Sequence, residues 1–298
     1  MNDRKDLIIG CASNYSWDQM KYWVNSIQKS GFTGDIAIVG TNITKDTIHK
    51  LSEKGVLLSL YGNQQEDGSI KSHSNGAPHV ERFFYIYNYL NTVSEKYINV
   101  ITTDVRDVIF QTDPSAWLEL NLFSHFLVSS EEGIRYKDEP WGNQNLLDTF
   151  GPFFHNILKE APIKNVGVLA GDLDYVRSLL LLLFQLSINR PIPIVDQAVY
   201  NFITTLNPFN HDTLITNNSD GWAVQLGTTK EAVRAGNGDL GQVYKNKMGE
   251  YEKLYYDDQP LFTTEGEVMN MNNDKFCIVH QWDRVPFLKT LIENKYGE

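Results

Sequence analysis

Residues 97–114 read YINVITTDVRDVIFQTDP, an apolar stretch that runs directly into an acidic turn. Residues 97–103 are rich in β-branched and aromatic side chains, which favours a buried strand. Charge is costly beside a buried strand, so the aspartates that follow raise the question of what they bind. In open α/β sheets, ligands bind outside the carboxyl ends of the strands. We therefore expect Asp104 and Asp107 to face such a site.

The region before this stretch alternates short apolar runs with amphipathic segments. We expect strands at 7–11, 35–40 and 55–60, and helices at 14–29 and 44–54, where apolar residues recur at helical spacing. Strand–helix alternation is typical of a parallel, layered α/β sheet with right-handed crossovers.

The region after it continues the pattern less regularly, with polar stretches between the apolar ones. Further helices are expected at 80–94, around 117–118, and at 173–188, 196–205 and 286–294. Further strands are expected at 125–129, 165–171, 222–226 and 276–280. Irregular structure is expected at 61–78, 131–145 and 236–266. With no internal repeat or linker, one domain over 1–298 is the interpretation, and its second half is the less regular one.

Composition excludes several classes of protein. The chain has 298 residues, 42% of them hydrophobic and 21% charged, with a formal net charge of −11. These values are ordinary for a globular protein, and an acidic chain is a poor general binder of nucleic acid. There is no P-loop, GxSxG, HExxH or CxxC motif, so P-loop, serine-hydrolase and zinc sites of those types are not supported.

Two cysteines, Cys11 and Cys277, do not suggest a disulfide framework, and a reducing compartment is the simpler expectation. The opening MNDRKDLIIGCASN is a poor match to a signal peptide. The longest apolar run, residues 179–184, is far shorter than the roughly 20 residues of a membrane span. A cytoplasmic protein is expected, and peripheral contact with a membrane surface is compatible with it.

Four segments could carry chemistry. Asp104 and Asp107 are suited to a divalent cation, which prefers oxygen ligands, although aspartates also cap turns and could simply pair with Arg106. His280 ends an apolar strand, where imidazole can complete a metal site or serve as a structural histidine. Asp196 and Gln197 open a helix, as a functional pair or as a cap.

The fourth segment, NVGVLAG at residues 165–171, has glycines at Gly167 and Gly171 that permit close approach of a sugar or pyrophosphate, or close sheet packing.

The order of these segments resembles the GT-A glycosyltransferases, which transfer a sugar from a nucleotide-sugar donor with the help of a divalent metal. Asp104-Val105-Arg106-Asp107 is similar to their DxD element, with the two acids one residue further apart. Asn165, Gly167 and Gly171 look like an NxGxxxG element near the donor sugar. Asp196-Gln197, with Asn201, looks like the DQ element of glycogenin-like and lipopolysaccharide sugar transferases, and His280 looks like their C-terminal metal ligand.

The residues Gln281, Trp282, Asp283 and Arg284 look like a feature of some bacterial and viral surface-polysaccharide transferases. The resemblance implies a GT-A-like single α/β domain. Its central sheet is Rossmann-like and mostly parallel, with helices on both faces. Residues 1–130 would form the nucleotide-sugar-binding half, and residues 131–298 a less regular acceptor-binding half.

The resemblance also implies roles. Mn²⁺ or Mg²⁺ is the expected cofactor, held by Asp104, Asp107 and His280, with Asp107 the better candidate. Asp196 is the first choice for a catalytic base, with Glu139 and Glu131 as rivals. The expected substrate contacts are Arg82, Asp104, Arg106, Trp141, Asn165, Gly167, Gly171, Gln197, Gln281, Trp282 and Arg284.

The implied function is a hexosyltransferase that moves a sugar from a nucleotide-diphosphate sugar, with a UDP-hexose favoured, to a glycan or lipid-linked acceptor in surface polysaccharide synthesis. Two alternatives stay open. A sugar-phosphate nucleotidyltransferase would share the sheet and the acids, but normally has a Gly-rich basic loop where this chain reads CASNYSW, residues 11–17. A non-catalytic carbohydrate-binding protein on a degenerate transferase fold is the other.

Overall fold

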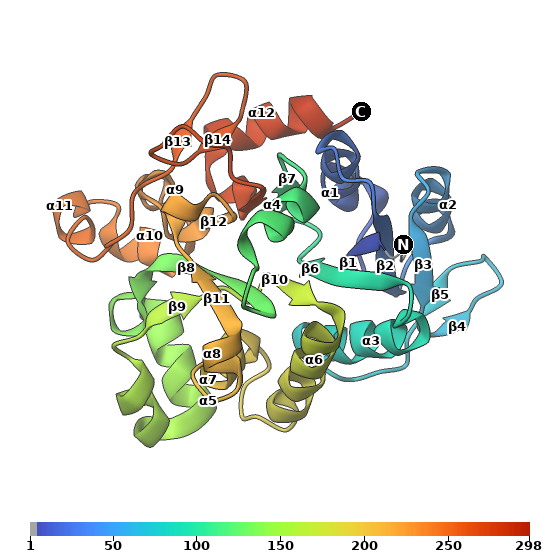
Figure 1. Ribbon diagram of the computed structural model, residues 1–298, viewed down its shortest axis with the longest axis horizontal. Helices are drawn as coiled ribbons and strands as arrows, with labels where there is room; N and C mark the ends of the chain where they lie inside the picture. Colours follow the sequence, from blue (N-terminus) through green and yellow to red (C-terminus); the bar gives the residue numbers. More distant parts are fainter. Residues whose placement is uncertain (1–4) are drawn as a thin grey trace.

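A large mixed sheet runs through the computed structural model, which describes residues 5–298 (Figure 1). Its strands lie in the order β11-β8-β10-β6-β1-β2-β3, and β9 pairs with β8. The bounds are β1 (Lys5–Ser13), β2 (Asp35–Thr41), β3 (Leu57–Leu60), β6 (Tyr97–Thr103), β8 (Leu127–Arg135), β9 (Pro162–Lys164), β10 (Val168–Asp172) and β11 (Thr213–Thr216).

Helices cover both faces of this sheet (Figure 1). Successive side chains of a strand point to opposite faces. In β1, Leu7 and Ile9 therefore pack with α3 and α6, whereas Ile8 packs with α1 on the other face. Each fully buried Leu or Ile contributes about 1.5–3 kcal/mol relative to exposure. The helices of these layers are α1 (Trp17–Lys29), α2 (Lys45–Glu53), α3 (Pro78–Val93), α6 (Leu173–Ser187) and α7 (Asp196–Thr204).

Most neighbouring strands are parallel, as expected. The exceptions are β10, which runs antiparallel to both β6 and β8, and β9, which runs antiparallel to β8. In this register Val168 lies opposite Thr103, at the carboxyl end of β6, whereas Gly171 lies opposite Val100, further from that end. The start of β10 and the residues before it are therefore brought to the acidic turn.

A second, three-stranded sheet completes the frame around the turn. It has the order β12-β15-β7, formed by β7 (Val108–Phe110), β12 (Ala223–Gln225) and β15 (Ile278–His280). His280 lies opposite Val108 on one side and Gln225 on the other. Because β15 pairs with β7, His280 lies beside the turn that follows β6, although the two are far apart in the sequence.

The second half of the chain is more regular than the sequence indicates. The expectation of irregular structure at 131–145 is wrong, because β8 continues to Arg135 and α5 (Pro140–Leu158) begins soon afterwards. Helix α5 begins at Pro140, whose fixed φ suits a first helical turn, and breaks at Gly151, where φ is 75°. Residues 236–266 likewise contain two short helices rather than only loops.

The remaining elements are short helices, two small hairpins and the C-terminal helix. They are α4 (Pro114–Asn121), α8 (Phe209–Asp212), α9 (Lys230–Ala235), α10 (Gly238–Tyr244), α11 (Met248–Tyr251), α12 (Pro286–Tyr296), β4 (Asn63–Gln64), β5 (Ile70–Lys71), β13 (Leu261–Phe262) and β14 (Val268–Met269). Between residues 5 and 298, no helix is both long and apolar enough to cross a membrane.

Candidate active site

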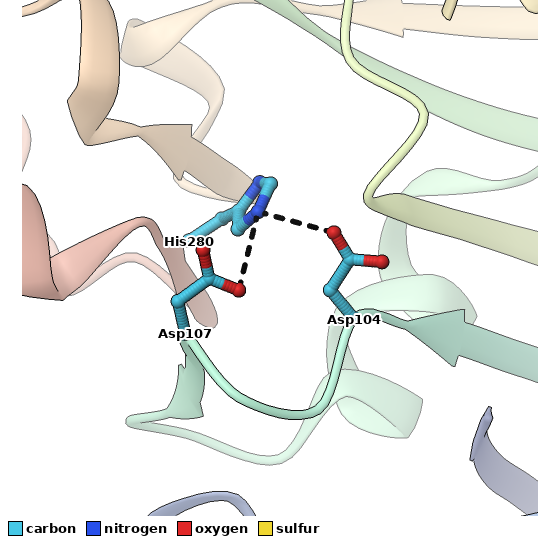
Figure 2. A group of neighbouring side chains, drawn as sticks. All are labelled: Asp104, Asp107 and His280. Carbon is cyan, nitrogen blue, oxygen red and sulfur yellow. Dashed lines mark ion pairs between the residues drawn. The ribbon is translucent and has the colours of Figure 1, made fainter. Parts of the chain in front are cut away.

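The acidic turn is fixed by backbone contacts at both ends. The N–H of Asp104 donates to the carbonyl of Gly167 (2.9 Å), and the carbonyl of Asp107 accepts from the N–H of Gln281 (2.7 Å). Between them Val105 is buried against β1, at a place where Gly10 leaves room for it. The two carboxylates therefore rise from the same turn toward His280, although two residues separate them (Figure 2).

His280 closes a compact group of three ligand-type side chains. Its Nε2 lies 3.6 Å from Oδ2 of Asp104 and 3.8 Å from Oδ1 of Asp107 (Figure 2). One ligand atom from each of the three residues lies within 4.8 Å of the others. Two carboxylates and one imidazole are ligands that suit Mn²⁺ or Mg²⁺. The group could therefore hold a metal ion.

Burial and neighbouring charges shift the pKa of each of these three groups in opposite directions. Burial disfavours ionised Asp104, but the charge of Arg82 and contact with His280 outweigh it and lower the pKa of Asp104. Burial raises the pKa of Asp107, although His280 opposes that shift. Burial disfavours the imidazolium form of His280, but the two carboxylates outweigh it and raise its pKa. A cation bound here competes with protons for the same ligand atoms.

Arg82, from α3, connects the acidic turn to α7. Its Nη1 pairs with Oδ1 of Asp104, and its Nη2 donates to Oδ2 of Asp196 at 2.8 Å. Burial disfavours its charge, but both carboxylates outweigh burial and raise the pKa of Arg82. The expected role of Arg82 was direct contact with substrate; in the structure its two terminal nitrogens are engaged by carboxylates.

A cavity of about 610 Å³ opens over this group. Most of the residues expected to form the site line it: Arg82, Asp104, Arg106, Asp107, Glu139, Trp141, Asn165, Gly167, Asp196, Gln197, His280, Gln281 and Arg284. They come from segments far apart in the sequence, because β10 and β15 bring their ends to the carboxyl end of β6.

Two of the expected substrate contacts lie elsewhere. Gly171 is outside the cavity lining, and a side chain there would meet the carbonyl oxygen of Phe126 at 2.1 Å, so this glycine serves strand packing. Trp282 is 3% exposed, and its ring packs edge-on to Tyr22 with centroids 5.3 Å apart. The 3₁₀ turn after β15 sends this tryptophan into the core rather than toward the cavity.

Glu139 and Gln281 line the cavity, and their side chains also accept hydrogen bonds from backbone N–H groups. The carboxylate of Glu139 accepts from the N–H groups of Trp141 (3.3 Å) and Gly142 at the start of α5. Burial raises the pKa of Glu139 to about 7, against the effect of these bonds. The side-chain oxygen of Gln281 accepts from the N–H of Gly227 (2.9 Å), which fixes the opposite wall.

The sequence analysis did not name several polar residues at the site, and Glu132 and Gln225 are two of them. Glu132 of β8 is buried, lines the cavity and accepts from Nδ2 of Asn165 (2.7 Å), and burial raises its pKa. Gln225, at the end of β12, contacts Nδ1 of His280 at 2.7 Å. Gln225 lies one residue before the end of the strand expected at 222–226, a position that could have marked it. Glu132 gave no such signal, because β8 was expected to end before it.

Gly167 has a local reason to be glycine. A Cβ atom there would lie 2.4 Å from Cε1 of His280 and 2.9 Å from Oδ1 of Asn165. We expect Gly167→Ala to displace the imidazole and weaken Mn²⁺ binding about tenfold, since orienting groups around metal ligands have effects of roughly 10–100-fold. Titration with Mn²⁺, followed by electron paramagnetic resonance, measures the Mn²⁺ affinity of the variant and of the wild type.

The matched control is Gly249→Ala in α11, where a Cβ meets no atom within 4 Å. We expect this variant to bind Mn²⁺ as the wild type does. Equal Mn²⁺ affinities in the two alanine variants would contradict a steric role for Gly167.

Comparison with known proteins gives a structural match only. No protein-family model matches the sequence, and no curated protein sequence is similar to it. The apo structure of the bifunctional glycosyltransferase WbbM matches 99% of this chain with a TM-score of 0.55 and 13% sequence identity. The crystal structure of the glycosyltransferase GlyE of Streptococcus pneumoniae TIGR4 matches 99% of the chain with a TM-score of 0.47 and 13% identity.

This chain spans about half of the WbbM chain, 50%, and 64% of the GlyE chain. At such identities, fold is what the comparison establishes. The expected α/β fold, with a mostly parallel central sheet between helices, is confirmed. The chain has the fold found in the glycosyltransferase WbbM, and its resemblance to GT-A glycosyltransferases is confirmed at the level of that fold.

Proposed function

We propose that this protein is a metal-dependent glycosyltransferase. It transfers a hexose from a nucleotide-diphosphate sugar, with UDP favoured, to a glycan or lipid-linked acceptor of a surface polysaccharide. The observation that carries the proposal is the Asp104–Asp107–His280 group, which lies in a cavity at the carboxyl end of β6 on a fold shared with a glycosyltransferase.

The three side chains would contribute different ligand atoms to the ion. Asp107 and Asp104 supply the negative charge, and Nε2 of His280 supplies the nitrogen. When bound, Mn²⁺ or Mg²⁺ supplies a Lewis acid that neutralises charge developing on the leaving nucleoside diphosphate. Arg106 and Arg284 line the same cavity and are suited to charge-assisted hydrogen bonds with phosphate.

The opposite wall of the cavity is suited to the sugar and the acceptor. Asp196 and Gln197 open α7 beside Arg82, which holds one oxygen of the Asp196 carboxylate. Asp196 is the first choice to receive the acceptor proton, and Glu139, with a pKa of about 7, is the second. Trp141, exposed at the cavity, offers a ring against which a sugar can stack.

The division of the chain into two halves is part of this proposal. Residues 1–130, with Arg82 and the acidic turn, would bind the nucleotide-sugar. Residues 131–298, with Glu139, Trp141 and α7, would bind the acceptor.

A calorimetric screen tests the proposal. UDP-, GDP- and dTDP-sugars are titrated into the wild-type protein with and without Mn²⁺. We expect one nucleotide to bind at least about tenfold more tightly with Mn²⁺, since metal ligation and phosphate charge act together at such sites. Slow release of the nucleoside diphosphate should accompany binding, through transfer to water.

Binding that is indifferent to Mn²⁺ would contradict the metal-dependent site. Mn²⁺-dependent binding without transfer to any acceptor or to water would favour a non-catalytic carbohydrate-binding protein.

A further inference from the structure

A buried line of polar side chains runs from the main sheet to His280. Nε2 of Gln225 donates to Oγ of Ser130 in β8 at 2.7 Å, and Oε1 of Gln225 lies 2.7 Å from Nδ1 of His280. Ser130 and Gln225 are 0% and 1% exposed. Water therefore does not replace either contact.

The direction of these hydrogen bonds determines which nitrogen of His280 carries the proton. An amide oxygen only accepts hydrogen bonds, so the contact with Gln225 requires a proton on Nδ1. In a neutral imidazole the lone pair then lies on Nε2. Nε2 is the nitrogen that faces Asp104 and Asp107.

The ring is also held in rotation. Gly167 faces Cε1 of His280 so closely that a Cβ atom would not fit. Contact with Gly167 on one side and the bond to Gln225 at Nδ1 leave Nε2 as the nitrogen that points toward the two carboxylates (Figure 2).

We propose that Gln225 is a positioning residue that fixes the tautomer and the ring orientation of His280 for a divalent cation, with Ser130 orienting the Gln225 amide in turn. This inference rests on the metal site of the proposed function. It adds a role for a residue outside the cavity lining. Partners of this kind, beyond the metal ligands, typically change metal affinity by about 10–100-fold.

A neutral amide suits this position. A carboxylate would make the same bond to Nδ1, but it would add a buried negative charge to a site that already holds Asp104, Asp107 and Glu132. The conservative replacement Gln225→Glu therefore keeps the acceptor, whereas Gln225→Met keeps the length of the side chain and removes the acceptor.

The test measures Mn²⁺ binding alone, by electron paramagnetic resonance, on the full chain without any nucleotide. We expect Gln225→Met to bind Mn²⁺ about 10–100-fold more weakly than the wild type, and Gln225→Glu to bind at least as tightly as the wild type. Thermal unfolding of each variant reports whether the fold is intact. Rescue by glutamate distinguishes positioning of His280 from simple packing, because both replacements fill the same space.

Wild-type affinity in a folded Gln225→Met, or equal weakness in folded Gln225→Met and Gln225→Glu, would overturn the proposal while leaving the metal site in place. A wild-type protein that binds no Mn²⁺ would instead overturn the metal site itself and this proposal with it. If Gln225→Met does not fold, Ser130→Ala takes its place. That variant should bind Mn²⁺ several-fold more weakly, and an unchanged affinity would overturn the proposal.

Discussion

The replacement Asp107→Asn should nearly abolish sugar transfer. The side chain of Asp107 is buried beside His280, and asparagine keeps its shape while removing the negative charge. Because loss of one electrostatic group of this kind costs about 10²–10³-fold in rate, we expect kcat/KM to fall by about 10³-fold. Mn²⁺ affinity should fall with it. Steady-state release of nucleoside diphosphate, measured across Mn²⁺ concentrations, checks both.

The matched control is the same change at Asp113, in the same stretch of sequence. Asp113 caps α4, where its Oδ1 accepts from the N–H of Ser115 at 2.9 Å. Asparagine caps helices about as well as aspartate. Asp113→Asn should therefore keep wild-type transfer. Full Mn²⁺-dependent transfer by Asp107→Asn would contradict the assignment of Asp107 as a metal ligand.

The second large effect is expected at Arg82. Arg82→Met leaves two carboxylates, Asp104 and Asp196, without their shared cation. Breaking a buried ion pair costs about 3–5 kcal/mol, and we expect about 3 kcal/mol here because the Asp104 side chain is 32% exposed. Transfer should fall by about 10²-fold, since Asp196 loses the contact that orients it. Urea unfolding and steady-state kinetics measure the two effects.

The loss of stability should depend on pH. In the wild type, Arg82 lowers the pKa of Asp104 against the effect of burial. The corresponding stabilisation is present above the unfolded pKa of about 3.9 and is lost as the pH falls below it. In Arg82→Met the Asp104 carboxyl, which has lost its cation, takes up a proton instead. The difference between the two proteins should therefore be largest near pH 7 and shrink as the pH is lowered toward 4.

A surface arginine provides the control. Arg177 pairs with Asp174 at 2.8 Å within α6, and that aspartate side chain is 72% exposed. Exposed pairs contribute at most about 1 kcal/mol, so Arg177→Met should unfold nearly as the wild type does. An equal loss of stability in Arg82→Met and Arg177→Met would contradict the bridging role of Arg82. A loss of stability in Arg82→Met that does not change with pH would contradict it as well.

The sequence by itself determined the local elements and the main chemical groups. The strands of the first half follow from short apolar runs and its helices from apolar residues at helical spacing, and each stretch carries these patterns without reference to the rest. Asp104, Asp107 and His280 could be selected because each lies at or just beyond the end of an apolar strand. The wider spacing of the acids looked like a departure, and it needed the structure to show that the turn still directs both carboxylates toward His280.

Only the tertiary structure decided which side chains meet. The antiparallel pairing of β10 with β6 brings Gly167 to the site and takes Gly171 away from it. The turn after β15 buries Trp282, and the extension of β8 supplies Glu132 and Ser130. Arg82 joins Asp104 to Asp196, and Gln225 joins β8 to His280. These contacts join residues far apart in the chain, and long-range pairing is fixed by the burial of whole faces rather than by any local pattern.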